Sequence, residues 1–125
     1  MDKQKQGLKA YKEGHGAEKI ALLYLLLKGY LPVRMNWKAG VCLGASEIDL
    51  IVKKGKNLVF VEVKKRPTFD ACAESLTPRV QQRILRAAEL FLSDNPSFET
   101  STLRFDSVWI AGGKIKHIQD VFEGE

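Results

Sequence analysis

The chain has 125 residues and a net charge of +5, and 45% of its residues are hydrophobic and 28% charged. These values describe one water-soluble domain, residues 1–125, and the longest apolar run, Ile20–Leu27, falls short of the roughly 20 residues of a membrane-spanning helix. The charged start MDKQKQGLK and two cysteines without a CxxC partner, Cys42 and Cys72, predict a cytoplasmic protein with reduced thiols and no membrane partner.

The first predicted element is a helix over residues 9–28, which ends at Gly29. Apolar residues recur in it at spacings of three and four, which predicts one buried stripe. The predicted stripe consists of Ala17, Ile20, Ala21, Tyr24 and Leu27. Glu18 lies beside the stripe, and two interpretations of it remain open: a surface carboxylate at the edge, or a carboxylate aimed at a site.

A first strand, Tyr30–Trp37, follows, with Pro32 near its beginning, where proline is tolerated. The next predicted segment is a loop over Lys38–Gly44. After it, the stretch Ala45–Arg66 has two runs of β-branched and aromatic residues on either side of the polar break Lys53–Asn57, which contains a glycine. This pattern predicts a β-hairpin.

The register of the hairpin follows from its turn. A turn between Gly55 and Lys56 pairs positions whose numbers sum to 111, so that Asp49 lies across from Glu62, and Glu47 across from Lys64. Because side chains alternate along a strand, these four should share one face. The other face is predicted to be apolar and to consist of Ile48, Leu50, Val52, Val59, Val61 and Val63.

Two carboxylates directly opposite each other need an explanation. At about 4 Å, Asp49 and Glu62 would repel each other by roughly 1–4 kcal/mol, depending on the dielectric, and such pairs are avoided in sheets. A divalent cation is the simplest compensation, since magnesium takes oxygen ligands. The alternative is an ordinary solvated face on which Lys64 pairs with Glu47.

The segment after the hairpin, Arg66–Leu76, has no regular pattern and is predicted to be irregular, as in a mobile flap. Thr77 and Pro78 then mark the start of a helix, as N-cap and first helical residue. The helix should run to about Leu92. Its predicted buried face consists of Val80, Ile84, Ala87, Ala88 and Phe91.

The last part of the chain predicts two more strands, Leu103–Ile110 and an edge strand Lys114–Gln119, joined by a tight Gly112-Gly113 turn. The order helix, strand, hairpin, helix, strand, strand predicts an α/β fold in which helices pack against a mixed sheet. The second hairpin strand, Leu58–Val63, is apolar on both faces and should be central.

Positive charge is concentrated in the first half of the chain. Residues 1–66 hold 14 Lys and Arg against 6 Asp and Glu, whereas residues 67–125 hold 6 against 9. The basic excess therefore surrounds the hairpin that carries the acidic cluster. A basic surface around carboxylates suits a polyanion that approaches a bound cation.

Several motifs occur in a fixed order between Gly14 and Val108: GxGAE, NW, EIDL, FVEVKxR, QxRI and RFD. This ordered set resembles the bacterial YraN-like proteins of the restriction-endonuclease-like superfamily, whose signature is an Asp followed by Glu-x-Lys on the next strand. The resemblance implies a restriction-endonuclease-like fold, with a mixed β-sheet of about five strands flanked by α-helices.

The resemblance also implies roles for individual residues. Asp49, Glu62 and Lys64 match the D…ExK set, and Glu18 matches a helix carboxylate. Val63, at the x position, would lend its backbone carbonyl to a metal.

Other positions of the pattern are matched less uniformly. Gln81 falls where relatives place a glutamine that supports the site. Two positions depart from the family pattern: Ser46 replaces a Gly before EIDL, and Val80 replaces a Lys before the glutamine.

These residues predict a Mg²⁺-dependent nuclease, with Mn²⁺ as an alternative ion, that hydrolyses phosphodiester bonds in DNA rather than RNA, branched or structured DNA included. Asp49, Glu62, Glu18 and the Val63 carbonyl would hold one or two cations. Lys64 would orient water or stabilise developing charge. Glu47 would pair with Lys64 or reach a second cation.

The nucleic acid would be held by basic side chains that contact its phosphates. These are Arg34, Lys38, Lys65, Arg66 and Arg83. A homodimer would suit the cleavage of two strands, by symmetry. The alternative function is a non-catalytic nucleic-acid-binding or scaffold protein that retains the nuclease fold.

Overall fold

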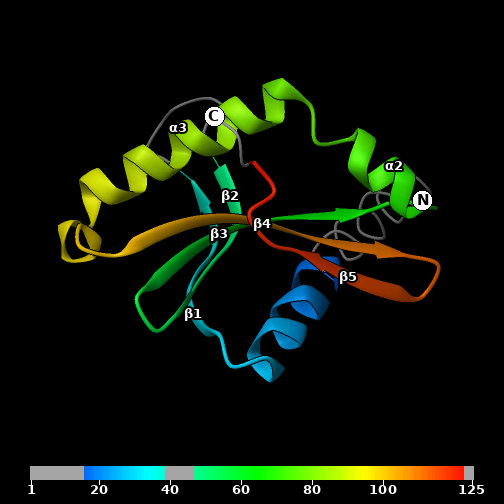
Figure 1. The fold of residues 1–125 in the computed structure, drawn as a ribbon, viewed down its shortest axis with the longest axis horizontal. Helices are drawn as coiled ribbons and strands as arrows, with labels where there is room; N and C mark the ends of the chain where they lie inside the picture. The colour runs from blue at the N-terminus through cyan, green and yellow to red at the C-terminus, as the bar shows by residue number, and fades with distance from the viewer. Residues whose placement is uncertain (1–15, 39–46, 123–125) are drawn as a thin grey trace, which may run out of the picture.

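A computed structural model describes residues 16–38 and 47–122 and contains a five-stranded mixed sheet (Figure 1). The sheet order is β1-β2-β3-β4-β5; β3 and β4 are parallel, and the other neighbours are antiparallel. The strands are β1 (Leu31–Lys38), β2 (Glu47–Lys54), β3 (Asn57–Lys65), β4 (Thr102–Ala111) and β5 (Lys114–Ile118). The predicted α/β class is confirmed, with β3 central and β5 at an edge.

Helices lie on both sides of this sheet (Figure 1). A helix over residues 16–27 covers one face, and α3 (Pro78–Asp94) covers the other. A short helix, α2 (Phe69–Glu74), precedes α3, and a 3₁₀ turn, Pro96–Phe98, follows it. No helix within the described ranges is long and apolar enough to cross a membrane.

The sheet separates two hydrophobic clusters, as expected for strands that are apolar on both faces. The cluster under the first helix contains Ala21, Leu25, Tyr30, Leu50, Val52, Val59, Val61 and Val108. The cluster under α3 contains Ile48, Ile51, Leu58, Phe60, Ile84, Ala87, Ala88 and Phe91. Each fully buried large side chain contributes about 1.5–3 kcal/mol, so the two clusters fix both helices against the strands that carry the acidic residues.

Helix α3 begins where its capping residues predict. The Thr77 hydroxyl accepts a hydrogen bond from the Val80 N–H at 3.3 Å, and Pro78 is the first helical residue. The helix ends at Asp94, two residues beyond the predicted Leu92. Its predicted buried face is confirmed, although Val80 is buried only in part.

The buried stripe predicted for the first helix is partly wrong. Ile20 is 48% exposed and Leu27 is 80% exposed, whereas Ala17, Ala21 and Leu25 are buried. These three follow a spacing of four, and the two alanines let the helix lie close to the sheet. Nearly every residue from 20 to 27 is apolar, so periodicity there does not distinguish the buried face. The predicted start of this helix at residue 9 lies outside the described residues.

The predicted hairpin register is confirmed. Pairs run from Leu50↔Val61 to Lys54↔Asn57, and Gly55 has a φ of +60°, as its turn requires. Pairing ends at Leu50↔Val61, one position before Asp49 and Glu62.

One residue of the predicted apolar hairpin face is placed wrongly. Ile48 packs on the α3 side, while Leu50 packs on the side of the first helix. Trp37, which pairs with Ile48 from β1, also packs on the α3 side. This change of face lies beside Asn36 on β1, which has a φ of +54°. Such irregularities in a strand increase its local twist.

The segment predicted to be an irregular flap contains α2 instead. Thr68 caps this helix by accepting a hydrogen bond from the Ala71 N–H at 3.1 Å. Cys72 is buried as a free thiol, with its sulfur 3.6 Å from the Lys64 carbonyl oxygen. The sulfur also lies 4.0 Å from the Ile110 carbonyl oxygen, so the segment is packed against the ends of β3 and β4. The loop residues Cys42 and Ser46 lie outside the described residues.

Candidate metal and nucleic-acid site

A cleft of about 430 Å³ opens where β2 and β3 stop pairing, between the first helix and α3. The two hairpin strands, the first helix and α3 all contribute side chains to it. The lining residues are Ala17, Glu18, Glu47, Asp49, Glu62, Val63, Lys64, Lys65, Arg66 and Arg83. The hairpin register thus brings all four of its predicted polar residues to one place, together with Glu18 from the helix.

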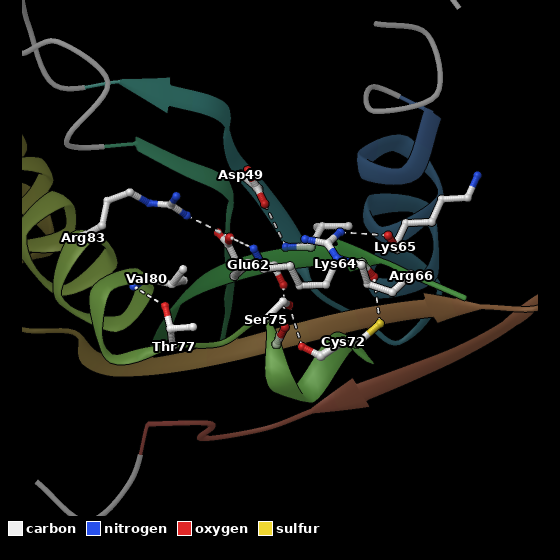
Figure 2. A network of polar contacts seen from close by, with 12 residues as sticks. Asp49, Glu62, Lys64, Lys65, Arg66, Cys72, Ser75, Thr77, Val80 and Arg83 are labelled. Atoms are coloured by element: carbon white, nitrogen blue, oxygen red, sulfur yellow. Dashed lines mark hydrogen bonds and ion pairs between the residues drawn. The ribbon is translucent and has the colours of Figure 1, made fainter. Parts of the chain in front are cut away.

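Glu62 is the most buried carboxylate of the cleft, with a side chain only 4% exposed. Its Oε2 atom receives two cationic groups: Lys64 Nζ at 3.0 Å and Arg83 Nη2 at 2.8 Å (Figure 2). A buried carboxylate needs such partners, because the loss of its hydration is otherwise too costly. Lys64 therefore pairs with Glu62 on its own strand, and the predicted pairing of Lys64 with Glu47 is not found among the described residues.

The backbone of Glu62 is held in place by a hydrogen bond from a side chain of β4. The Ser107 hydroxyl donates to the Glu62 carbonyl at 2.7 Å and accepts from Trp109 Nε1 at 2.9 Å. Ser107 is fully buried and lies beside Glu62 in the parallel register. Sequence reasoning missed this residue, although a serine directly before the apolar run VWI was a usable signal.

Asp49 lies at the end of the paired part of β2. Its Oδ2 atom accepts a hydrogen bond from the Val63 N–H at 2.8 Å (Figure 2). Burial, the nearby Glu62 carboxylate and then Glu18 raise the pKa of Asp49 to about 8, although the bond from Val63 opposes the shift. At neutral pH, a proton on Asp49 relieves the repulsion between this carboxylate and that of Glu62. A cation would displace that proton.

Two polar atoms in this cleft are buried without a hydrogen-bond partner in the described part of the chain: Glu62 Oε1 and Arg83 Nε. Leaving such a group unpaired costs about 1–3 kcal/mol. The first atom accepts and therefore suits a cation; the second donates and therefore suits an anion. A divalent cation together with a phosphate would satisfy both.

The oxygen donors of the cleft suit a hard cation such as Mg²⁺. Within residues 16–38 and 47–122, however, no three Asp, Glu, His or Cys side chains are already gathered as a metal-binding group. The Oε2 atom of Glu62 is instead paired with Lys64 and Arg83. A cation held by both oxygens of Glu62 would displace at least one of these partners.

The remaining predicted residues lie in different places. Lys65 and Arg66 are exposed on the rim of the cleft. Arg34 and Lys38 are exposed on β1, and Gln81 is half-buried on α3; none of the three lines the cleft. On α3 it is Arg83, two residues beyond Gln81, that reaches the acidic residues.

The RFD motif forms a separate ion cluster beneath the first helix. The Asp106 carboxylate is fully buried and accepts from Arg104 at 2.8 and 2.9 Å, from the Asp120 N–H at 3.0 Å, and pairs with His117 at 2.7 Å. Burial alone would raise the pKa of Asp106, but the bonds from His117 and Arg104 lower it below its ordinary value. None of these residues lines the cleft, so we assign this cluster to the stability of the fold.

Comparison with known proteins gives one family. The model of the family described as "Uncharacterised protein family UPF0102" matches residues 17–110. The UPF0102 protein of Paramagnetospirillum magneticum is 43% identical over 90% of this chain and 88% of its own length. Those of Parvibaculum lavamentivorans and Methylobacterium nodulans are 44% and 40% identical, over 93% and 92% of this chain and 85% and 87% of their own lengths. The matched residues include the whole cleft lining, and the predicted YraN-like relationship is confirmed.

Proposed function

This chain belongs to the UPF0102 family, and we propose that it is a Mg²⁺-dependent nuclease that hydrolyses phosphodiester bonds in DNA. The observation that carries the proposal is the convergence of Asp49, Glu62 and Lys64 on one cleft with a basic rim. The unpaired Glu62 Oε1 and Arg83 Nε atoms support a paired cation and phosphate there. The preference for DNA over RNA, and for branched or structured DNA, rests on the resemblance to restriction-endonuclease-like proteins.

The cation would be held by the carboxylates of Asp49 and Glu62, with Glu18 and the Val63 carbonyl as further oxygen donors. When bound, Mg²⁺ or Mn²⁺ lowers the pKa of a water molecule and neutralises charge on the phosphate. Lys64 lies beside Glu62 on β3, where its ammonium orients that water or stabilises the developing charge. Lys65 and Arg66 on the rim contact the phosphates that flank the scissile bond.

Cleavage assays on supercoiled plasmid and on four-way-junction DNA test this function, each with Mg²⁺, with Mn²⁺ and with a chelator. The wild type should cleave only with metal. Asp49→Ala and Lys64→Ala should each cleave about 10²–10³-fold more slowly than the wild type. Lys53→Ala is the matched control, because Lys53 is an exposed lysine on the same hairpin, near its turn. An RNA of the same sequence checks the choice of substrate. Failure of the wild type to cleave any DNA, or full activity in both variants, contradicts the proposal.

A second function, nucleic-acid binding without catalysis, is favoured by one observation. Glu62 Oε2 is already paired twice, and the described residues contain no preassembled metal-binding group. A binding protein of this kind would show DNA affinity that falls with salt, with a slope set by its Lys and Arg contacts. Addition of Mg²⁺ would leave that affinity no better than in a chelator, whereas the nuclease requires the ion.

A further inference from the structure

Arg83 contributes a cationic group to the cleft from a different element than the acidic residues. It lies on α3, next to the buried Ile84, and its guanidinium extends to Glu62 on β3 (Figure 2). Its side chain is 27% exposed, against 12% for Lys64. Lys64 is on the same strand as Glu62 and nearly buried, so Arg83 is the partner that can leave with less rearrangement.

Arg83 and Glu62 form only part of the hydrogen bonds that a guanidinium and a carboxylate can form with each other. Arginine and carboxylate commonly form two parallel hydrogen bonds, one to each oxygen. Here Arg83 contacts Oε2 alone, through Nη2, and shares that oxygen with Lys64. Both Glu62 Oε1 and Arg83 Nε remain buried and unpaired in the described part of the chain. In a permanent ion pair, we would expect Arg83 Nε to donate a hydrogen bond to Glu62 Oε1.

We propose that Arg83 is an exchangeable counter-ion: it neutralises Glu62 while no cation is bound, and it moves to a phosphate of the nucleic acid when a cation takes its place. This inference rests on the proposed function and adds a specific role for a residue of α3. The guanidinium suits the second position, because its planar fork matches phosphate oxygens. Arg83 therefore competes with the cation in the free protein and cooperates with it once nucleic acid is present.

The competition is tested on free protein, by calorimetric titration with Mn²⁺ and no nucleic acid. Arg83→Gln removes the competing charge and should bind Mn²⁺ about 3- to 10-fold more tightly than the wild type. Arg86→Gln is the matched control, because Arg86 is an exposed arginine one turn further along the same helix; its affinity should change less than twofold. Arg83→Lys keeps a charge in place and should bind Mn²⁺ as the wild type does. Glu62→Gln should abolish binding.

The cooperation is tested by anisotropy with a phosphorothioate duplex, whose integrity is checked on a gel. Mn²⁺ should strengthen duplex binding by the wild type and by Arg86→Gln, and strengthen it several-fold less in Arg83→Gln. Thermal melts establish that each variant is folded, and Arg83→Met, which also removes the charge, serves in place of Arg83→Gln if the latter is not.

Two results overturn the inference in distinguishable ways. If the wild type binds Mn²⁺ and Arg83→Gln binds it equally or more weakly, Arg83 does not compete and the inference alone fails. If the wild type binds no Mn²⁺ at all, the proposed function fails and the role of Arg83 fails with it.

Discussion

The carboxylate of Asp49 accepts a hydrogen bond from the backbone N–H of Val63 at 2.8 Å, just beyond the last pair of the β2–β3 ladder. A side chain thus joins two strands that no longer pair through their backbones. The contact holds Asp49 at the mouth of the cleft and turns the Val63 peptide toward it. Its consequence is that the position of the carboxylate and the separation of the two strands depend on each other.

The raised pKa of Asp49 predicts how stability depends on pH. Because its pKa is raised in the folded protein from 3.8 to about 8, folding favours the protonated form. Its stabilising contribution is therefore present at low pH and is lost as the pH rises through about 8. In a chelator, the free energy of unfolding obtained from thermal melts should fall between pH 5 and 9 in the wild type and fall less in Asp49→Asn, by a difference on the order of 2 kcal/mol. Parallel melting curves for the two proteins would contradict the assignment.

Ser107 is predicted to matter for both stability and cleavage. Ser107→Ala leaves the Glu62 carbonyl and Trp109 Nε1 buried without their partner, which should cost about 1–3 kcal/mol. Since Glu62 then loses its support, the cleavage rate should fall more than binding of the duplex does. Denaturant unfolding and single-turnover cleavage measure the two effects. The exposed Ser93→Ala is the control and should change neither.

The buried ion cluster around Asp106 predicts a different response to pH. Asp106→Asn leaves Arg104 without its charged partner and should cost about 3–5 kcal/mol. Because the pKa of Asp106 is lowered in the folded state, its contribution is present above the ordinary carboxyl pKa and is lost as the pH falls below it. Urea unfolding at pH 7 and at pH 3 measures both; the penalty of the variant should shrink at the lower pH. Asp120→Asn, at an exposed aspartate, provides the comparison.

The first helix offers a direct test of which of its leucines are buried. Leu25 is fully buried, and Leu25→Ala should cost about 2–5 kcal/mol. Leu27 is 80% exposed, and Leu27→Ala should change stability by less than about 0.5 kcal/mol. The two variants delete the same atoms two residues apart, so thermal unfolding distinguishes the faces. Equal losses would show that the exposed face of this helix is covered in solution.

The hairpin could be predicted in detail because its information is local. A two-residue turn and alternating side chains determine the register, and the strands found lie within one or two residues of those predicted. The first helix could not be oriented in the same way, since its apolar residues surround it. Helix α2 was missed although its capping Thr68 was present, because six residues give little periodicity.

The sequence predicts which hairpin residues lie together in the cleft, but not how they pair. Asp49, Glu62 and Lys64 share the cleft, as the register required. The other partners of Glu62 could not be predicted, because Arg83 and Ser107 reach it from elements 21 and 45 residues away in the sequence. The shifted pKa of Asp49 depends likewise on burial by the completed fold.

The parallel pairing of β3 with β4 has a consequence for the order of assembly. The two strands are joined through α2 and α3, so they meet only after this long connection has been made, and such distant contacts form slowly. A nascent chain that has been synthesised only through the hairpin would expose its acidic residues. It would still lack Arg83, which neutralises Glu62, and Ser107, which supports it. The complete cleft is therefore assembled late, when the second half of the molecule packs against the first.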